Sequence, residues 1–293
     1  MSNTSLQHGS AYVNGVRLHY VTQGTGKLVI LLHGFPEFWY SWRHQIPALA
    51  EHFQVVAPDM RGYNESDKPA GVANYRLDLL TADVMGLIRA FGEERALIIG
   101  HDWGGGVAWT FAADYPQATE RLIVLNCPHP DALQKQLRSN FRQLRRSWYM
   151  FFFQIPWLPE ALFRLNRRRF VEQAFRGMAI RKEAFPDEDL QRYVEASAKP
   201  GALTAAINYY RAMFRDFLRR GERKFAKIAC PTLLIWGEED VALGKELTYN
   251  MEPYFTDRFE IKYIPRCSHW VQQEQPELVN QYMLEFLADL TTR

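Results

Sequence analysis

A glycine-rich stretch directly after an apolar run is the strongest constraint on how this chain folds. Residues 96–99 are aliphatic, and Gly100-His101-Asp102-Trp103-Gly104 follows them, ahead of a helical pattern. A sharp turn from a strand into a helix, flanked by glycines because larger residues would clash, holds its central residue in a strained conformation above a sheet. The sequence therefore predicts that Asp102 stands at such a turn, with its side chain exposed.

Short aliphatic runs alternate with helical segments at both ends of the chain. This alternation predicts a mostly parallel, doubly wound α/β sheet, whose active site lies beyond the carboxyl ends of the strands. Buried strands are expected at residues 28–32, 54–57, 96–99, 121–125, 231–236 and 259–264. Helices are expected at residues 42–50, 77–91, 105–115 and 275–290, and an edge hairpin at 10–23 around Asn14-Gly15.

The alternation is interrupted after Pro128, where arginine-rich and aromatic segments with helical spacing take over. We expect a helical cap at residues 128–222, inserted between core halves at residues 1–127 and 223–293. A cap at this edge of the sheet would cover Asp102 and exclude water. The apolar stretch at 148–163 is too short and too interrupted by proline to span a bilayer, so we expect it to be buried within the protein.

Composition and charge are those of an ordinary globular enzyme. The chain has 293 residues, 47% hydrophobic content and a net charge of +2, so its total charge indicates no nucleic-acid partner. Its three cysteines lack metal-ligand spacing, and residues 1–10 lack the layout of a signal peptide. We therefore expect a cytoplasmic protein with reduced thiols, without a metal or a transmembrane segment, as a monomer or homodimer.

Arginines gather at residues 138–146 and again at 167–169. The first interpretation is a solvated helix face, which is the usual role of such clusters. An anionic membrane surface or a partner protein is the alternative.

The carboxylate of Asp102 restricts the chemistry that the turn can support. Its reference pKa of about 4 leaves it ionised at neutral pH, so it needs no activating base. Attack on an acyl carbon would give only a labile anhydride, whereas attack on an electrophilic sp3 carbon gives an alkyl ester that water can later cleave. The expected substrates therefore have a strained ring or a carbon–halogen bond.

Chain order supplies the partners of Asp102. Asp240 follows a later strand and His269 follows the last strand, which is the nucleophile, acid and histidine order of α/β-hydrolases. A histidine held by a carboxylate can take a proton from water. Asp240 can equally be the N-cap of a helix, and both roles can hold; a purely structural role for His269 also stays open. A metal-binding role for His101 with Asp102 would need further histidines at helical spacing, so we expect His101 to be buried and structural.

Two backbone amides are candidates for an oxyanion hole. His33-Gly34-Phe35-Pro36 follows the first core strand, at the place where this fold donates one amide, here that of Phe35. Trp103, next to Asp102, would donate the other. Each such donor typically contributes about 3 kcal/mol when charge develops on a carbonyl oxygen. His33 is expected to brace its loop.

With these motifs in place, the chain resembles the epoxide hydrolases of the α/β-hydrolase fold, which are relatives of the haloalkane dehalogenases. The resemblance implies Asp102 as nucleophile, Asp240 and His269 as the charge-relay pair, and the same two backbone donors. Asn64 stands where the family usually has glycine, and asparagine tolerates the left-handed conformation. The matching segments are HGFPEFWYSWR from His33, DMRGYNESDKP from Asp59, GHDWGGGVAW from Gly100, LIWGEED from Leu234 and CSHWVQQEQP from Cys267.

The resemblance also implies two tyrosines in the cap. Tyr149, within residues 147–154, is similar to the first family tyrosine, and residues 208–211 are similar to the second region, where the alignment favours Tyr210 over Tyr209. An alkoxide leaving from an epoxide needs an acid, whereas a halide needs only weak N–H donors. The expected reaction is hydrolysis of a small apolar epoxide by water to a vicinal diol, without a cofactor.

Two other functions remain open. A haloalkane dehalogenase would use the same nucleophile, although Phe35 offers no side-chain donor for a halide. A ligand-binding receptor on a hydrolase fold would keep the pocket without turnover. Trp39, Trp42 and Trp148 are expected either to line an apolar tunnel or to belong to the core.

Overall fold

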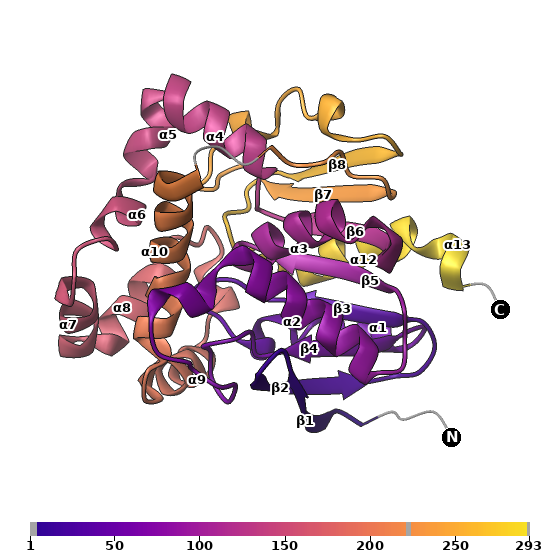
Figure 1. Ribbon diagram of the computed structural model, residues 1–293, viewed down its shortest axis with the longest axis horizontal. Helices are drawn as coiled ribbons and strands as arrows, with labels where there is room; N and C mark the ends of the chain where they lie inside the picture. Colours follow the sequence, from indigo (N-terminus) through magenta and orange to yellow (C-terminus); the bar gives the residue numbers. More distant parts are fainter. Residues whose placement is uncertain (1–4, 221–223, 292–293) are drawn as a thin grey trace.

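Eight strands form one sheet in the computed structural model, which describes residues 5–220 and 224–291. The strand order is β1-β2-β4-β3-β5-β6-β7-β8, with β1 and β2 antiparallel at one edge and the rest parallel (Figure 1). The mostly parallel sheet predicted from the alternation is confirmed. The strands are β1 (Gln7–Val13), β2 (Val16–Gln23), β3 (Leu28–Leu32), β4 (Gln54–Pro58), β5 (Ala96–His101), β6 (Thr119–Leu125), β7 (Thr232–Gly237) and β8 (Phe259–Ile264).

Helices cover both faces of this sheet, which explains why its central strands are continuously apolar. One buried cluster packs α2 (Leu77–Ala90) and α3 (Trp103–Asp114) against one face. A second cluster packs α1 (Gln45–Ala50) and α12 (Pro276–Phe286) against the other. Every residue of β3, β5 and β7 is buried as a result. The short helices α11 (Val271–Glu274) and α13 (Ala288–Thr291) flank α12.

The expected edge hairpin is present as β1 and β2. Its two turn residues, Asn14 and Gly15, have φ angles of 48° and 78°. Positive φ at both positions is what a tight two-residue hairpin turn requires, and asparagine followed by glycine tolerates it best. The local sequence therefore fixes this turn.

A helical insertion lies between β6 and β7, as the interrupted alternation predicted (Figure 1). Aromatic side chains join it to the core: Phe175 of the cap packs against Trp270 of the core, with ring centroids 4.7 Å apart and the ring planes tilted by 34°. The division at residues 127 and 128 stays a prediction, and the boundary at 222 and 223 lies outside the described residues. The insertion contains α4 (Pro130–Ser139), α5 (Phe141–Arg146), α6 (Trp148–Phe152), α7 (Leu158–Leu165), α8 (Arg167–Ala174), α9 (Asp187–Ala198) and α10 (Ala202–Arg220).

The expectation that residues 148–163 are buried holds for only one side of this stretch, where Phe153 is buried with Tyr149, Met150, Phe152 and Phe163 packed around it. The exposed fractions are 61% for Trp148, 50% for Phe151 and 82% for Trp157, while Phe153 is 3% exposed. A short helix at the surface turns only one side toward the protein, so the other side of this apolar stretch points outward. Trp148 therefore belongs neither to a tunnel nor to the core.

The two other tryptophans differ from Trp148. Trp42 is fully buried in the core, and Trp39 is partly buried beside it. Within the described residues, no helix combines the length and the apolar character needed to cross a membrane.

The sharp turn predicted between β5 and α3 depends on a very close approach of backbones. A Cβ at Gly104 would lie 2.0 Å from the carbonyl oxygen of Leu32, and one at Gly100 would lie 2.3 Å from that of Gly104. Asp102, between them, has a φ of 50° and a ψ of −120°. The glycines are therefore required by contact distance, and the turn raises Asp102 above the carboxyl end of the sheet.

Two glycines of α3 provide a matched test of this contact. Gly104→Ala places a Cβ against the immobile backbone of β3, so we expect the free energy of unfolding to fall by about 3 kcal/mol or more. Gly106→Ala meets no atom within 4 Å and should raise it by about 0.5–1 kcal/mol, because alanine favours a helix. Urea denaturation of both variants measures the difference; equal midpoints would contradict the proposed contact.

Candidate active site

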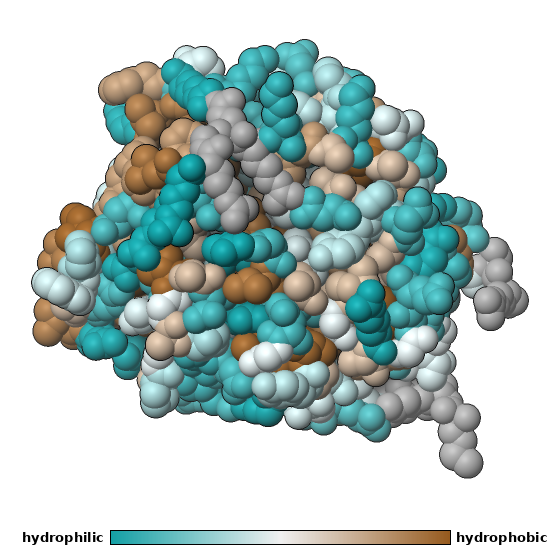
Figure 2. Space-filling view, viewed as in Figure 1, coloured by the Kyte–Doolittle hydropathy of each residue, from teal (hydrophilic) through white to brown (hydrophobic). Residues whose placement is uncertain are grey.

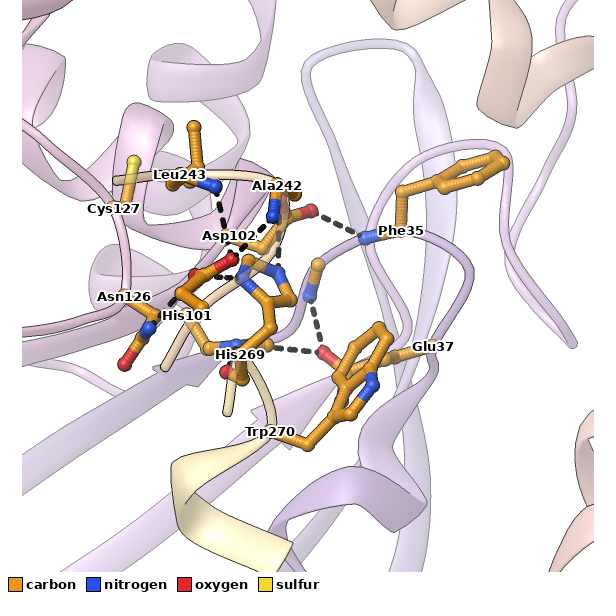
Figure 3. A network of polar contacts seen from close by, with 12 residues as sticks. Phe35, Glu37, His101, Asp102, Asn126, Cys127, Ala242, Leu243, His269 and Trp270 are labelled. Carbon is orange, nitrogen blue, oxygen red and sulfur yellow. Dashed lines mark hydrogen bonds and ion pairs between the residues drawn. The ribbon is translucent and has the colours of Figure 1, made fainter. Parts of the chain in front are cut away.

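The carboxylate of Asp102 lies between a backbone amide and a histidine. The N–H of Phe35 donates to its Oδ1 at 2.7 Å, and its Oδ2 lies 3.5 Å from Nε2 of His269 (Figure 3). Burial raises the pKa of Asp102, but the hydrogen bond and charge of His269, the charge of His101 and the amide of Phe35 outweigh it. The net pKa is lowered, so Asp102 stays ionised at neutral pH.

His269 is placed between two carboxylates. Its Nδ1 lies 2.7 Å from Oδ2 of Asp240, on the side of the ring opposite Asp102. Burial lowers the pKa of His269, but the charge of Asp240 and the contact with Asp102 raise it well above its ordinary value. The imidazole is therefore protonated while both carboxylates are ionised, and it would release its proton more readily if Asp102 were neutral.

Asp240 also binds the backbone that follows it. Its Oδ1 accepts hydrogen bonds from the amides of Ala242 at 2.8 Å and Leu243 at 2.9 Å. These are the contacts expected of an N-cap, although residues 241–243 form a bend and not a helix. Burial raises the pKa of Asp240, but the charge and hydrogen bond of His269, the amide of Leu243 and the side chain of Asn126 outweigh burial, so the net pKa is lowered. The N-cap interpretation is therefore wrong, because no helix begins directly after Asp240; its carboxylate orders a bend in the loop and contacts His269.

Two tyrosines from different cap helices meet above this turn. The rings of Tyr149 in α6 and Tyr210 in α10 are 5.8 Å apart and nearly perpendicular. The Tyr210 ring lies 5.0 Å from Trp103 and 5.5 Å from Phe35. Burial first, and then the charge of Asp102, raise the pKa of both phenols. Both hydroxyl groups therefore keep their protons at neutral pH and can donate hydrogen bonds.

The neighbouring Tyr209 points away from Asp102. Its hydroxyl donates to the carbonyl oxygen of Arg61 at 2.6 Å, and its ring packs against Tyr63 and Tyr75. The Tyr209 ring also lies 5.4 Å from that of Trp103, so both tyrosines reach the start of α3. Consecutive residues of a helix project in different directions, however, and the Tyr209 hydroxyl is held by Arg61. Of the alternatives that the sequence left open, the structure brings Tyr210 to the site.

The two amides considered for an oxyanion hole occupy different settings. Phe35 already donates to the carboxylate of Asp102. Trp103 is the first residue of α3, where backbone N–H groups have no partner within the helix and the helix dipole favours negative charge. The role of both amides stays a prediction.

A buried network behind Asp102 was not predicted. Glu37 is 1% exposed, and its Oε2 lies 2.8 Å from Nδ1 of His101 (Figure 3). Nε2 of His101 lies 2.9 Å from the carbonyl oxygen of His269, so the expected buried His101 fixes the loop of His269. The Glu37 carboxylate and the His269 carbonyl oxygen are both acceptors. His101 can bind both if each of its ring nitrogens carries a proton, or if Glu37 carries a proton and donates it to the ring. The other carboxylate oxygen of Glu37 accepts from the amides of Gln272 at 3.0 Å and Gln273 at 2.9 Å.

The sequence places Asn126 at the carboxyl end of a strand, where the active site is expected, but it does not predict what Asn126 contacts. Its Nδ2 donates to Oδ2 of Asp240 at 2.8 Å, and its Oδ1 accepts from the amide of Gly237 at 2.8 Å. The sequence signal was a lone polar residue at the end of a buried strand. For Glu37 it was an acidic residue in an otherwise apolar loop next to Pro36. Both signals mark a position at the carboxyl edge of the sheet without saying what it contacts.

The described residues contain no group of three or more His, Cys, Asp or Glu side chains arranged to hold a metal ion. Cys127, Cys230 and Cys267 form no disulfide, and the first of them is half-buried beside the site. The pKa of the Cys127 thiol is raised well above its ordinary value, first by burial and then by the charges of Asp102 and Asp240. This thiol is therefore a poor nucleophile or metal ligand.

Comparison with known proteins agrees with this geometry. A family model described as alpha/beta hydrolase fold matches residues 27–276. Epoxide hydrolase 4 of Mus musculus is 41% identical over 286 residues, covering 96% of this chain and 79% of that protein. The AB hydrolase superfamily protein YfhM of Bacillus subtilis is 43% identical over 279 residues, covering 94% of this chain and 96% of that protein. The crystal structure of the Bacillus megaterium epoxide hydrolase in complex with an inhibitor has a TM-score of 0.85 and 34% identity, covering 96% of this chain and 100% of that one.

The two carboxylates around His269 make a testable electrostatic prediction. Asp102→Asn removes one of the charges that raise the pKa of His269, so that pKa should fall. A histidine titration followed by NMR measures the change. Asp67→Asn, which removes an exposed carboxylate paired with Arg17, is the control and should leave the pKa of His269 unchanged. An equal pKa in wild type and the Asp102 variant would contradict the described arrangement.

Proposed function

This chain belongs to the epoxide hydrolase family of the α/β-hydrolase fold, and from that membership we propose that it hydrolyses an apolar epoxide to a vicinal diol. The proposed intermediate is an alkyl ester on Asp102. The observation that carries the proposal is the position of Asp102: its carboxylate is held by Phe35 and His269 under the hydroxyl-bearing rings of Tyr149 and Tyr210.

The first proposed step opens the ring. An oxygen of Asp102 attacks a ring carbon, the bond from that carbon to the epoxide oxygen breaks, and Tyr149 or Tyr210 protonates the oxygen as it leaves. The raised pKa values of the two phenols keep them protonated beforehand. Because ester formation removes the charge of Asp102, which contributes to those pKa values, loss of a phenolic proton becomes easier as the step proceeds.

The second proposed step cleaves the ester. Water attacks the carbonyl carbon of the ester, His269 accepts a proton from the water, and the amides of Phe35 and Trp103 stabilise the resulting oxyanion. The bond between the carbonyl carbon and the alcohol oxygen then breaks, and the proton on His269 passes to that oxygen. The proton left on the new carboxyl group of Asp102 passes to His269, which restores the charges of the free enzyme. One oxygen of the regenerated carboxylate comes from water.

The same electrostatics support the order of the two steps. In the free enzyme two carboxylates keep His269 protonated. Once Asp102 is esterified, only Asp240 still raises the pKa of His269, so the imidazole can pass its proton to the phenolate left by the first step and then act as a base. The charge of Asp102 thus controls when His269 can act as a base.

Isotope labelling tests the covalent intermediate directly. A single turnover of styrene oxide in oxygen-18 water should place one heavy oxygen in the peptide that contains Asp102, as measured by mass spectrometry. His269→Gln should accumulate the ester, and Asp102→Ala should lower the rate of diol formation by about 10⁴-fold or more, because it removes the nucleophile.

The controls for this experiment separate the alternatives. No heavy isotope in the peptide would contradict a covalent route. Bromide release from a bromoalkane without diol formation from styrene oxide would favour a dehalogenase. Binding of styrene oxide without either product would favour a receptor.

The tyrosines provide a matched set of variants. Tyr149→Phe combined with Tyr210→Phe should lower the rate of ester formation by about 10² to 10⁴-fold, because the leaving oxygen then has no acid. Tyr209→Phe removes a hydroxyl that donates to Arg61, so it should lower the free energy of unfolding by about 1–3 kcal/mol and leave ester formation unchanged. Stopped-flow kinetics and urea denaturation measure the two quantities. Ester formation at the wild-type rate in the double variant would exclude the assigned role.

A further inference from the structure

The outer edge of the cap exposes a group of large apolar side chains. Figure 2 shows hydrophobic residues gathered along the left margin of the molecule, over α5, α6 and α7. Isolated exposed apolar residues are ordinary, but a contiguous group marks a contact surface. We call this group the cap edge; its members are Phe141, Trp148, Phe151, Trp157, Leu162 and Leu165, each between 47% and 82% exposed.

Positive charge surrounds the cap edge. Residues 132–169 contain nine Lys and Arg side chains and a single acidic one, Glu160. The remainder of the chain has 26 Lys and Arg against 32 Asp and Glu, so it is net negative. Glu160 is itself buried and paired with Arg211 at 2.6 Å. Arg146 and Arg168 pair with acidic residues outside this segment, and the other basic residues keep it net positive where the apolar side chains are exposed.

Several of these arginines are open to solvent. Arg142 and Arg145 share α5 with Phe141, and Arg164 shares α7 with Leu162 and Leu165. All three arginines are exposed, and none belongs to an ion pair that joins two described residues. Their guanidinium groups are thus available to bind anions outside the protein.

We propose that the cap edge docks on a bilayer that contains anionic phospholipids. Exposed Trp, Phe and Leu side chains can enter the boundary between headgroups and acyl chains, while basic side chains beside them bind lipid phosphates and carboxylates. Neither contribution is strong alone: a few apolar side chains give reversible binding, and basic residues alone are screened by salt. The cap edge combines the two, and the proposal does not depend on the reaction catalysed.

The charge pattern disfavours a second copy of this chain as the occupant. A two-fold symmetric dimer pairs the same patch of both subunits, so dimerisation through the cap edge would place its basic residues against one another. Such like-charge contacts oppose association. An anionic surface complements the same residues.

Sedimentation of the full chain with vesicles tests the proposal. Binding to phosphatidylcholine vesicles that contain about one-third phosphatidylserine should exceed binding to pure phosphatidylcholine vesicles, and should weaken from about 0.02 M to about 0.5 M NaCl. Arg142→Gln, Arg145→Gln and Arg164→Gln together should weaken binding about a hundredfold, since each basic residue near a membrane surface contributes about fivefold. Phe141→Ser, Trp157→Ser and Leu165→Ser together should reduce the binding that remains at high salt.

Matched substitutions on the core test whether vesicle binding depends on where the basic and apolar residues lie, and not only on how many the protein has. Arg89→Gln, Arg95→Gln and Lys227→Gln remove the same charge from exposed core positions and should leave vesicle binding within about twofold of wild type. Tyr12→Ser, Val241→Ser and Tyr249→Ser remove exposed apolar side chains from the core and should also leave vesicle binding within about twofold of wild type. Circular dichroism melting checks that each variant is folded.

Each result decides for or against the proposal. Selective loss in the two cap-edge variants supports it. The proposal is overturned if wild type fails to bind anionic vesicles, if it binds neutral ones equally, or if core and cap-edge variants behave alike. It is also overturned if sedimentation velocity shows a dimer that the apolar cap-edge variant abolishes, because the face would then be covered by a second copy.

Discussion

The approach of α3 to the end of β3 is the contact on which the rest of the site depends. No Cβ fits at Gly104, because the backbone of β3 occupies that space. The same approach raises Asp102 above the sheet and brings the loop after β3 close enough for Phe35 to donate to it. Since Leu32 and Gly100 are paired across β3 and β5, this geometry is set by the register of two rigid parallel strands.

The position of Asp102 above the sheet requires that its negative charge be compensated by a neighbouring group. Asp102 and Asp240 are carboxylates withdrawn from water, and His269 between them supplies the opposite charge. A buried charge is costly unless it is paired and hydrogen-bonded, and here Phe35, Asn126 and backbone amides saturate the carboxylate oxygens. The arrangement is stable in the free enzyme yet sensitive to loss of one negative charge, which is the property that a two-step ester mechanism requires.

The side-chain packing of the cap was less predictable from the sequence than that of the core. Its helices were predictable from helical spacing, but which apolar side chains turn inward was not, because short helices joined by tight bends can be rotated without changing their local pattern. Phe153 is buried while Trp148 and Trp157, within the same apolar stretch, are exposed. Likewise Tyr209 and Tyr210 are equivalent by composition, and only the packing of α10 against the core separates them.

The residues alone predicted the alternating core, the interruption by a helical insertion, the turn at Asp102, His269 as the side chain that reaches it, and Asp240 as the partner of His269. Each of these depends on local periodicity, on glycine at a close approach, or on the order of strand ends, which a single chain displays directly. Tertiary structure alone decided that Glu37 binds His101, Gln272 and Gln273, that Asn126 holds Asp240, and that the cap edge faces solvent. These contacts join residues far apart in the chain, and no local pattern encodes which distant side chains meet when helices and strands pack.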